Sequence, residues 1–457
     1  MIPYIGAKCK KAIGSVRKDS ENVFDICSRL CYTNPITRNR KDVNIIMKKS
    51  TMRKYAKLIV RVGANVQKGQ PVLLYTSVDQ HEFAVMVAEE CYRAGASRVQ
   101  MEWSCQPLTK LAYRHQSLKT LSTVLPWQEE KFKQMAKDFP CRIHIASEDP
   151  DGLKGINMEK MQKAQMATYP IIKPYREAIE CKHQWTIAAV PSAAWAKKVF
   201  PEMKKSQAIE ALWDAILKAV RVSDDPDNDP IIEWARHNEN FKKRCNWHNA
   251  QKFEYLTYKS ANGTDFRVDL IPQGQWCGGG EYTKQGVYFN PNMPTEEVFT
   301  SPMKGKAEGK VVSTMPLSYQ GQLIENFWIR FENGSAVEWD AEAGKEVLDR
   351  MLTMDEGARR LGEVALIPVS SPINQSGILF YETLFDENAS CHLAMGRGYN
   401  DCLEGHMDMT NEECQALGIN DSMIHVDFMI GAKDLNITAT TVDGKEIAIF
   451  KDGNWAF

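Results

Sequence analysis

The chain has 457 residues, of which 43% are hydrophobic, and its 57 basic and 58 acidic side chains leave a formal net charge of −1. A chain of this length can bury sizeable cores and most often forms two domains. A net charge near zero gives no global field that would favour nucleic acid or an anionic membrane as a partner, and no apolar run approaches the roughly 20 residues that cross a bilayer.

Residues 1–51 differ in charge from the rest of the chain. They contain eleven basic and four acidic side chains, so the remainder is net acidic. No compact apolar stretch with a small-residue cleavage site accompanies the basic residues, which argues against a targeting peptide. We therefore expect a basic extension that is poorly ordered or non-native, with a partner-binding arm as the second interpretation and Met52 as a plausible alternative start.

Residues 52–250 have the pattern of an α/β domain. A helical periodicity over residues 81–94 separates two β-like runs, which predicts a βαβ unit. Continued alternation of strands and helices predicts a mainly parallel sheet wrapped by helices. Neither a Gly-x-Gly-x-x-Gly nor a Walker-type loop is present, so the pattern does not indicate a bound nucleotide. The expected strands are residues 70–76, 95–101, 141–146 and 185–190.

Residues 251–457 follow a helical stretch, residues 231–251, and change to a hairpin-rich pattern. Two-residue turn signals of the kind that hairpins favour recur between β-like runs, and one helix is expected over residues 343–361. We expect an α+β catalytic domain, with the boundary near residue 250. The turn signals are Asn262-Gly263, Asn333-Gly334 and Asp443-Gly444.

Residues 424–428 place two potential metal ligands on one face of a predicted strand. Alternation directs His425 and Asp427 to one face and the three apolar residues to the other. An imidazole beside a carboxylate is costly to bury unless something charged satisfies both, and a divalent cation does so. The stretch suggests a metal site, although a solvated strand edge or a hydrogen-bonded pair would show the same pattern.

Earlier segments add carboxylates and a second imidazole. Glu297 precedes a β-forming run, and Glu363 interrupts an apolar strand-like run. Glu387, His392 and Tyr399 share one short, glycine-broken segment. A glutamate inside an apolar strand must be paired, protonated or bound to a cation, so ordinary ion pairs and a shared metal centre both remain open.

Six of these residues resemble the metal-binding and catalytic set of the aminopeptidase T family, thermophilic-type metalloaminopeptidases that include aminopeptidase S and PepS. Their successive separations of 66, 29, 7, 26 and 2 residues match the family pattern without a gap. The resemblance extends from about Arg53 to the end of the chain. In chain order, the six residues are Glu297, Glu363, His392, Tyr399, His425 and Asp427.

Three carboxylates and two imidazoles are enough for a site of two divalent ions if one carboxylate bridges them. Mixed nitrogen and oxygen ligands without thiolate suit zinc, cobalt or manganese. Glu363 is expected as bridging ligand or general base, and Tyr399 as hydrogen-bond donor to the oxyanion of the transition state. Cys391 points to the opposite strand face from its neighbour and is expected in the core. The expected metal ligands are Glu297, Glu363, His392, His425 and Asp427, with Glu387 as a further candidate.

The function implied is that of a hydrolase: a metal-dependent aminopeptidase that uses a water activated by two metals to release N-terminal residues from peptides, acting as a homodimer. Twelve cysteines without a Cys-x-x-Cys pair favour reduced thiols and a cytoplasmic location.

Two alternatives remain open. A non-haem iron oxygenase could use His392, His425 and one carboxylate, which would leave other glutamates surplus. A non-catalytic metal or peptide binder would keep the site without turnover.

Overall fold

The computed structural model describes residues 49–179 and 182–457. The chain divides into two units between residues 45 and 46, and the second unit contains the described fold. The basic extension expected over residues 1–51 lies outside the described residues except for its last three, which begin helix α2 (Lys49–Leu58). No helix of the described part combines the length and the apolar character that crossing a membrane requires.

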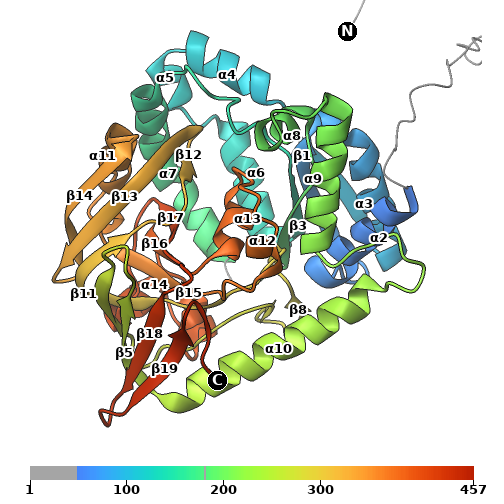
Figure 1. Cartoon of the computed structure of the whole chain (residues 1–457). Helices are drawn as coiled ribbons and strands as arrows, with labels where there is room; N and C mark the ends of the chain where they lie inside the picture. The colour runs from blue at the N-terminus through green and yellow to red at the C-terminus, as the bar shows by residue number, and fades with distance from the viewer. Residues whose placement is uncertain (1–48, 180–181) are drawn as a thin grey trace, which may run out of the picture. The chain divides into compact units, whose positions relative to one another are not determined.

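A five-stranded parallel sheet organises the first half of the described chain (Figure 1). One face is apolar, because alternate residues such as Val72, Leu74 and Ile143 point into a core that also contains side chains of α2 and several later helices. The predicted mainly parallel sheet is confirmed, and the expected helix over residues 81–94 matches α3. In spatial order the strands are β2 (Arg98–Ser104), β1 (Pro71–Ser77), β3 (Cys141–Ala146), β4 (Trp185–Ala189) and β9 (Asn292–Met293).

The helices of this half vary in length, and a π-helical turn, Ile59–Gly63, continues α2. They are α3 (His81–Ala94), α4 (Gln106–His115), α5 (Leu118–Leu121), α6 (Pro126–Asp138), α7 (Met158–Ile179), α8 (Ala193–Val199), α9 (Lys205–Ala219) and α10 (Pro230–Gln251).

The second face of the parallel sheet is lined by polar and aromatic side chains. The strand register places Arg142 beside Trp185, and Tyr75 beside His144, whose rings stack with centroids 6.3 Å apart. These side chains are half-buried or exposed. This face therefore borders a cavity over part of its area instead of a second apolar core.

A nine-stranded antiparallel sheet begins directly after α10, in the order β12-β13-β11-β6-β5-β18-β19-β20 with β14 paired to β13. All three predicted hairpins are confirmed, and at Asn333-Gly334 both residues have the positive φ angles of a type I′ turn. The strands are β5 (Phe253–Lys259), β6 (Asp265–Leu270), β11 (Pro302–Val312), β12 (Leu317–Tyr319), β13 (Gln322–Glu332), β14 (Ser335–Ala343), β18 (Asn436–Thr441), β19 (Glu446–Lys451) and β20 (Asn454–Trp455).

A separate four-stranded antiparallel sheet packs against the same apolar core as the nine-stranded sheet. Its strands are β10 (Val298–Thr300), β15 (Leu361–Leu366), β16 (His392–Gly396) and β17 (His425–Met429). The other elements of this half are β7 (Glu281–Tyr282), β8 (Tyr288–Phe289), α11 (Lys345–Leu352), α12 (Pro372–Gln375), α13 (Thr383–Asp386) and α14 (Asn411–Leu417).

The helix predicted over residues 343–361 is wrong beyond its first half, because α11 ends at Leu352. The Asp355 carboxylate accepts hydrogen bonds from the backbone N–H groups of Ala358 and Met423. These bonds hold the segment as a turn, so the chain enters β15 at Leu361.

The two halves are interleaved across the boundary expected near residue 250. Helix α10 reaches from the α/β half to β5 (Figure 1), and β9 returns to pair with β4. Residues 373–389 return again, and the Trp195 indole N–H donates a hydrogen bond to the carbonyl of Phe380. The division into domains 52–250 and 251–457 remains a prediction. Because the two halves are interleaved, both contribute residues to the lining of one cavity.

Tyr55 provides a test of how α2 is anchored. Its buried hydroxyl donates to the Ala189 carbonyl at 3.1 Å and accepts from the Ala189 N–H at 3.3 Å, which joins α2 to the end of β4. We expect Tyr55→Phe to lower the free energy of unfolding by about 1–3 kcal/mol, because two backbone groups lose their partner in a buried position. The midpoint of urea unfolding measures this loss.

Tyr258 is the matched control, since it is equally buried but its hydroxyl has no hydrogen-bond partner in the described structure. We expect Tyr258→Phe to be neutral or slightly stabilising. Equal destabilisation by the two substitutions would contradict the role given to the Tyr55 hydroxyl.

Candidate metal centre

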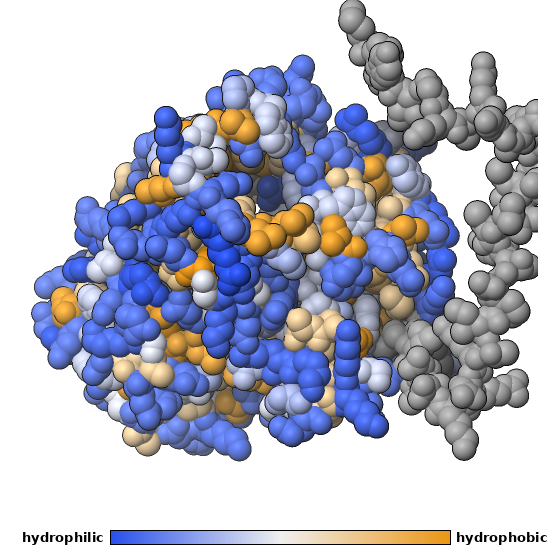
Figure 2. Space-filling view, turned by 90° about the horizontal axis from the view of Figure 1, so that it is seen from above, coloured by the Kyte–Doolittle hydropathy of each residue, from blue (hydrophilic) through white to orange (hydrophobic). Residues whose placement is uncertain are grey.

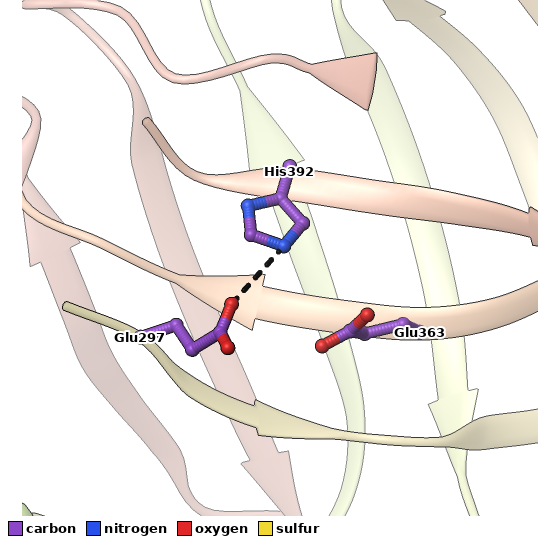
Figure 3. A group of neighbouring side chains, drawn as sticks. All are labelled: Glu297, Glu363 and His392. Atoms are coloured by element: carbon purple, nitrogen blue, oxygen red, sulfur yellow. Dashed lines mark ion pairs between the residues drawn. The ribbon is translucent and has the colours of Figure 1, made fainter. Parts of the chain in front are cut away.

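The four-stranded sheet positions the candidate ligands. Glu297 directly precedes β10, Glu363 lies in β15, His392 opens β16, and His425 and Asp427 lie in β17. Figure 3 shows Glu297, Glu363 and His392 reaching from three neighbouring strands toward a common point. Residues more than a hundred positions apart in the sequence are thus brought together by strand pairing.

Strand register explains why these side chains share one face. Ala394 of β16 pairs with Glu363 on one side and with Asp427 on the other, so all three lie in one row. The Ala394 methyl group is small enough to leave space between the two carboxylates. The opposite face is apolar, with Val426 and Phe428 in the core, which confirms the alternation predicted for residues 424–428.

Two overlapping groups of side chains have the compactness of metal sites. In the first, ligand atoms of Glu297, Glu363 and His392 all lie within 4.8 Å of one another. In the second, the same limit holds for Glu363, His425 and Asp427, where His425 Nε2 lies 3.1 Å from Glu363 Oε2 and 3.2 Å from Asp427 Oδ1. Glu363 belongs to both groups, so one carboxylate could serve two ions.

Backbone carbonyls orient both imidazoles. His425 Nδ1 lies 2.7 Å from the Arg397 carbonyl, and His392 Nδ1 lies 3.0 Å from the Glu387 carbonyl. An Nδ1–H donated to a carbonyl leaves the Nε2 lone pair of the neutral ring pointing at the centre. His392 Nε2 then faces Glu297 Oε2 at 3.4 Å, a contact of two acceptors that a cation between them would make favourable.

The acids of the centre strongly disfavour simultaneous ionisation. Burial, with the charges of Glu363 and Asp427, raises the pKa of Glu297 well above its usual value. Burial, with the charge of Asp427, also raises the pKa of Glu387. Burial opposes ionisation of Asp427 as well, but His425 and His392 lower its pKa to about 2. Added positive charge is therefore needed for the whole set to be ionised.

A divalent cation fits this need. Asp427 Oδ1 is buried and has no hydrogen-bond partner in the described structure. Burial lowers the pKa of His425, but Asp427 and Glu363 outweigh it and raise the pKa well above the usual value. A proton on His425 and a cation would thus compete for the same position, as at sites where metal binding releases protons. The oxygen and nitrogen donors suit zinc, cobalt or manganese.

Tyr399 lies at the edge of the centre. Its hydroxyl is 2.9 Å from His425 Nε2, its ring packs edge-on against Phe299, and its backbone N–H donates to Ser301 Oγ at 2.8 Å. Burial of the hydroxyl and the surrounding carboxylates raise the pKa of the phenol well above its usual value. The group therefore remains protonated and can donate a hydrogen bond.

All seven residues singled out in the sequence lie around this centre. Glu387, on a 3₁₀ turn before β16, lies outside the two compact groups but borders the same cavity. Cys391 lies in the apolar core, as predicted. The Arg397 carbonyl and Ala394, which orient and make room for the ligands, were missed because a backbone carbonyl and an alanine have no distinctive sequence signal.

The centre opens into a cavity of about 950 Å³. Its walls come from the four-stranded sheet, from α10 and from the second face of the parallel sheet, including Arg142 and Trp185. A cavity of this size accommodates a small organic ligand or a short peptide. Its residues from the first half were not predicted as site residues.

Comparison with known proteins identifies relatives along nearly the whole chain. Residues 48–455 match the model of a family described as thermophilic metalloprotease (M29). Aminopeptidase AmpS of Bacillus subtilis is 43% identical over 404 residues, which are 88% of this chain and 98% of that protein. Aminopeptidase T of Thermus thermophilus is 38% identical over 408 residues, 89% of this chain and 98% of that protein.

The solved structure of wild-type AmpT from Thermus thermophilus superimposes with a TM-score of 0.81 at 38% identity. The match covers 90% of this chain and 100% of the other. The similarity therefore includes both the parallel and the antiparallel sheets.

Gly362 tests whether the backbone behind the ligands controls metal binding. A Cβ at this position would lie 2.1 Å from the Arg397 carbonyl oxygen, which accepts the hydrogen bond from His425 Nδ1. We expect Gly362→Ala to displace that carbonyl and weaken metal binding by roughly 10- to 100-fold, the usual effect of losing a ligand's supporting hydrogen bond. Titration of the folded protein against a competing chelator measures the affinity.

Gly309 is the control, because a Cβ there would lie 2.2 Å from the Asp265 carbonyl oxygen in the nine-stranded sheet. Gly309→Ala should lower stability while the folded fraction keeps its affinity for metal. If both variants weaken metal binding equally, the effect is one of general destabilisation and the role of the Arg397 carbonyl is refuted.

Proposed function

The chain belongs to the thermophilic metalloprotease family (M29), and from this premise we infer that it is a metal-dependent aminopeptidase. The substrates we propose are peptides, from which it hydrolyses the N-terminal peptide bond. The observation that carries the proposal is the pair of compact ligand groups that share Glu363 on the wall of a cavity large enough for a short peptide.

We propose that the centre holds two divalent ions, with zinc, cobalt or manganese as candidates. Four carboxylates, those of Glu297, Glu363, Glu387 and Asp427, carry a charge that two divalent ions would balance. Such ions would act as Lewis acids on the scissile carbonyl and lower the pKa of a water molecule. The proposed ligands are Glu297, Glu363, His392, His425 and Asp427, with Glu387 as a further one.

The residues of the chain would divide the remaining work. Glu363, common to both groups, takes the shared position. Tyr399 donates its phenol hydrogen to the substrate oxygen that becomes negatively charged, which stabilises the transition state more than the ground state. The cavity walls hold the peptide and exclude bulk water, which strengthens these interactions.

The proposal extends to assembly and location. Large apolar side chains are exposed at the end of β2 and on α4 and α6, among them Trp103, Leu108 and Trp127. Figure 2 shows apolar patches on the face of the molecule that is seen from above. Such patches support a homodimer, in which a second copy covers apolar surface. Among the described cysteines, Cys91, Cys141 and Cys391 are free thiols, which supports a reducing, cytoplasmic setting.

The alternative of a non-haem iron oxygenase has less support. A 2-His-1-carboxylate site would use His392, His425 and one acid, and would leave at least two buried carboxylates without a counter-charge. Family membership and the relatives named as aminopeptidases favour the hydrolase.

Metal removal tests the activity directly. We expect chelation to abolish release of the N-terminal residue from short peptides, and re-supply of zinc, cobalt or manganese to restore it. Peptides with an acetylated N-terminus should resist cleavage, since an aminopeptidase requires the free amine. Full activity of the metal-free chain, or equal cleavage of acetylated peptides, would contradict the proposal.

Substitutions separate the roles of Tyr399 and Glu363. We expect Tyr399→Phe to retain both ions and lower turnover by roughly 10²–10³-fold, the usual effect of losing one oxyanion donor. Glu363→Gln should lose occupancy of at least one ion, because it removes the shared charge. Elemental analysis and steady-state kinetics measure both effects.

Near wild-type turnover of Tyr399→Phe would return that side chain to a packing role. Full ion occupancy with lost turnover in Glu363→Gln would assign Glu363 to proton transfer instead of metal bridging.

A further inference from the structure

The cavity that contains the metal centre also contains two arginines from the first half of the chain. Arg142 is the second residue of β3, on the polar face of the parallel sheet beside Trp185, and Arg176 lies in the last turn of α7. Both line the cavity together with Glu297 and Glu363. The same cavity is therefore lined by basic side chains on one wall, Arg142 and Arg176, and by the carboxylates of the metal centre on another.

Neither guanidinium group has an ion pair or side-chain hydrogen bond among the described residues, whereas neighbouring cations do. Lys173, three residues before Arg176, lies 2.8 Å from Asp421, and Lys131 lies 2.6 Å from Glu102. Burial, together with the charge of Arg176, lowers the pKa of Arg142, so the two groups are close enough to repel each other. Two neighbouring guanidinium groups, one half-buried on β3 and one exposed on α7, repel each other, and an anion bound by both would relieve that repulsion.

His183 contributes a buried nitrogen without a hydrogen-bond partner in the described structure to the same wall of the cavity. It is 5% exposed, its Nδ1 lies 2.9 Å from the Ile179 carbonyl, and its Nε2 is buried without a hydrogen-bond partner in the described structure. Burial and the charge of Arg142 lower the pKa of His183 to about 4, so the ring is neutral at physiological pH. Nε2 can then accept a hydrogen bond from an N–H group of a ligand.

The nearby helix α10 does not neutralise this wall. It adds Glu239 and Lys242, one charge of each sign and both exposed. The cavity thus has excess positive charge around Arg142 and Arg176 and excess carboxylate at the metal centre. A peptide with free termini carries the matching pattern, an ammonium group at one end and a carboxylate at the other.

We propose that Arg142 and Arg176 bind the C-terminal carboxylate of a short peptide whose N-terminal residue lies at the metal centre. A guanidinium group matches a carboxylate with two parallel hydrogen bonds, and the enclosed site strengthens them. This inference deepens the proposed function and rests on it. It names the substrate class as short peptides with a free C-terminus, of a length set by the span between the two ends of the cavity.

The test compares uncharged peptides of two to six residues as free acids and as C-terminal amides, with the metal-loaded full-length chain. We expect kcat/KM to favour the acid by roughly 10- to 100-fold at one preferred length, mainly through KM, because one charge-assisted pair is lost in the amide. The preference should decline for longer peptides. A third series, amides with a C-terminal glutamate, separates an α-carboxylate from a side-chain carboxylate.

Variants assign the preference to the arginines. Arg176 is exposed, so Arg176→Gln should fold, and we expect its acid-to-amide ratio to fall toward one. Arg142→Gln should do the same, Arg176→Lys should keep part of the preference, and Arg176→Glu should invert it. Lys173→Gln is the control on the same helix and should leave the ratio unchanged, because Lys173 pairs with Asp421.

Equal hydrolysis of acids and amides at every length would overturn the inference while the aminopeptidase stands. So would an unchanged ratio in both glutamine variants, or a stronger preference for the glutamate side chain than for the α-carboxylate. Failure of the metal-loaded chain to cleave any of the peptides would overturn the proposed function and this inference with it.

Discussion

The physical constraint on which the site depends is the placement of four carboxyl groups and two imidazoles in a space largely removed from water. Burial, together with the neighbouring carboxylates, raises the pKa values of Glu297 and Glu387 well above their usual values, so ionisation of the whole set is unfavourable. Positive charge supplied within a few ångströms removes that conflict and converts the cluster from an energetic cost into a binding site. Either a bound cation or a proton on His425 can supply this positive charge, and the two would occupy the same position.

The surrounding fold satisfies this constraint through small, specific features. Ala394 separates Glu363 from Asp427 in the strand register, and a backbone carbonyl fixes each imidazole. Gly362 lets the Arg397 carbonyl come close enough to do so. The interleaving of the two halves then closes the space in front of the four-stranded sheet with a wall from the parallel sheet. An acidic centre and a basic wall consequently face one cavity.

Patterns with a short period could be predicted well from the sequence. Alternation located the strand with His425 and Asp427, and turn residues located three hairpins, because both signals depend on local backbone geometry. Features fixed by long-range contacts could not be predicted from local patterns, and the grouping of ligands from distant segments rested on the family resemblance. The helix expected over residues 343–361 ends early because Asp355 binds the backbone of a distant segment. The sequence identified Arg142 only as a polar residue in a predicted strand, because no local signal shows that it lines the same cavity as Glu363.

The most direct test of the central claim is a crystal structure of the chain loaded with a single metal, with anomalous diffraction recorded at that metal's absorption edge. The account predicts two peaks separated by about 3.5–4 Å, with Glu363 in contact with both ions. One group should also include Glu297 and His392, and the other His425 and Asp427. A single peak, or two ions with Glu363 in contact with neither, would contradict it.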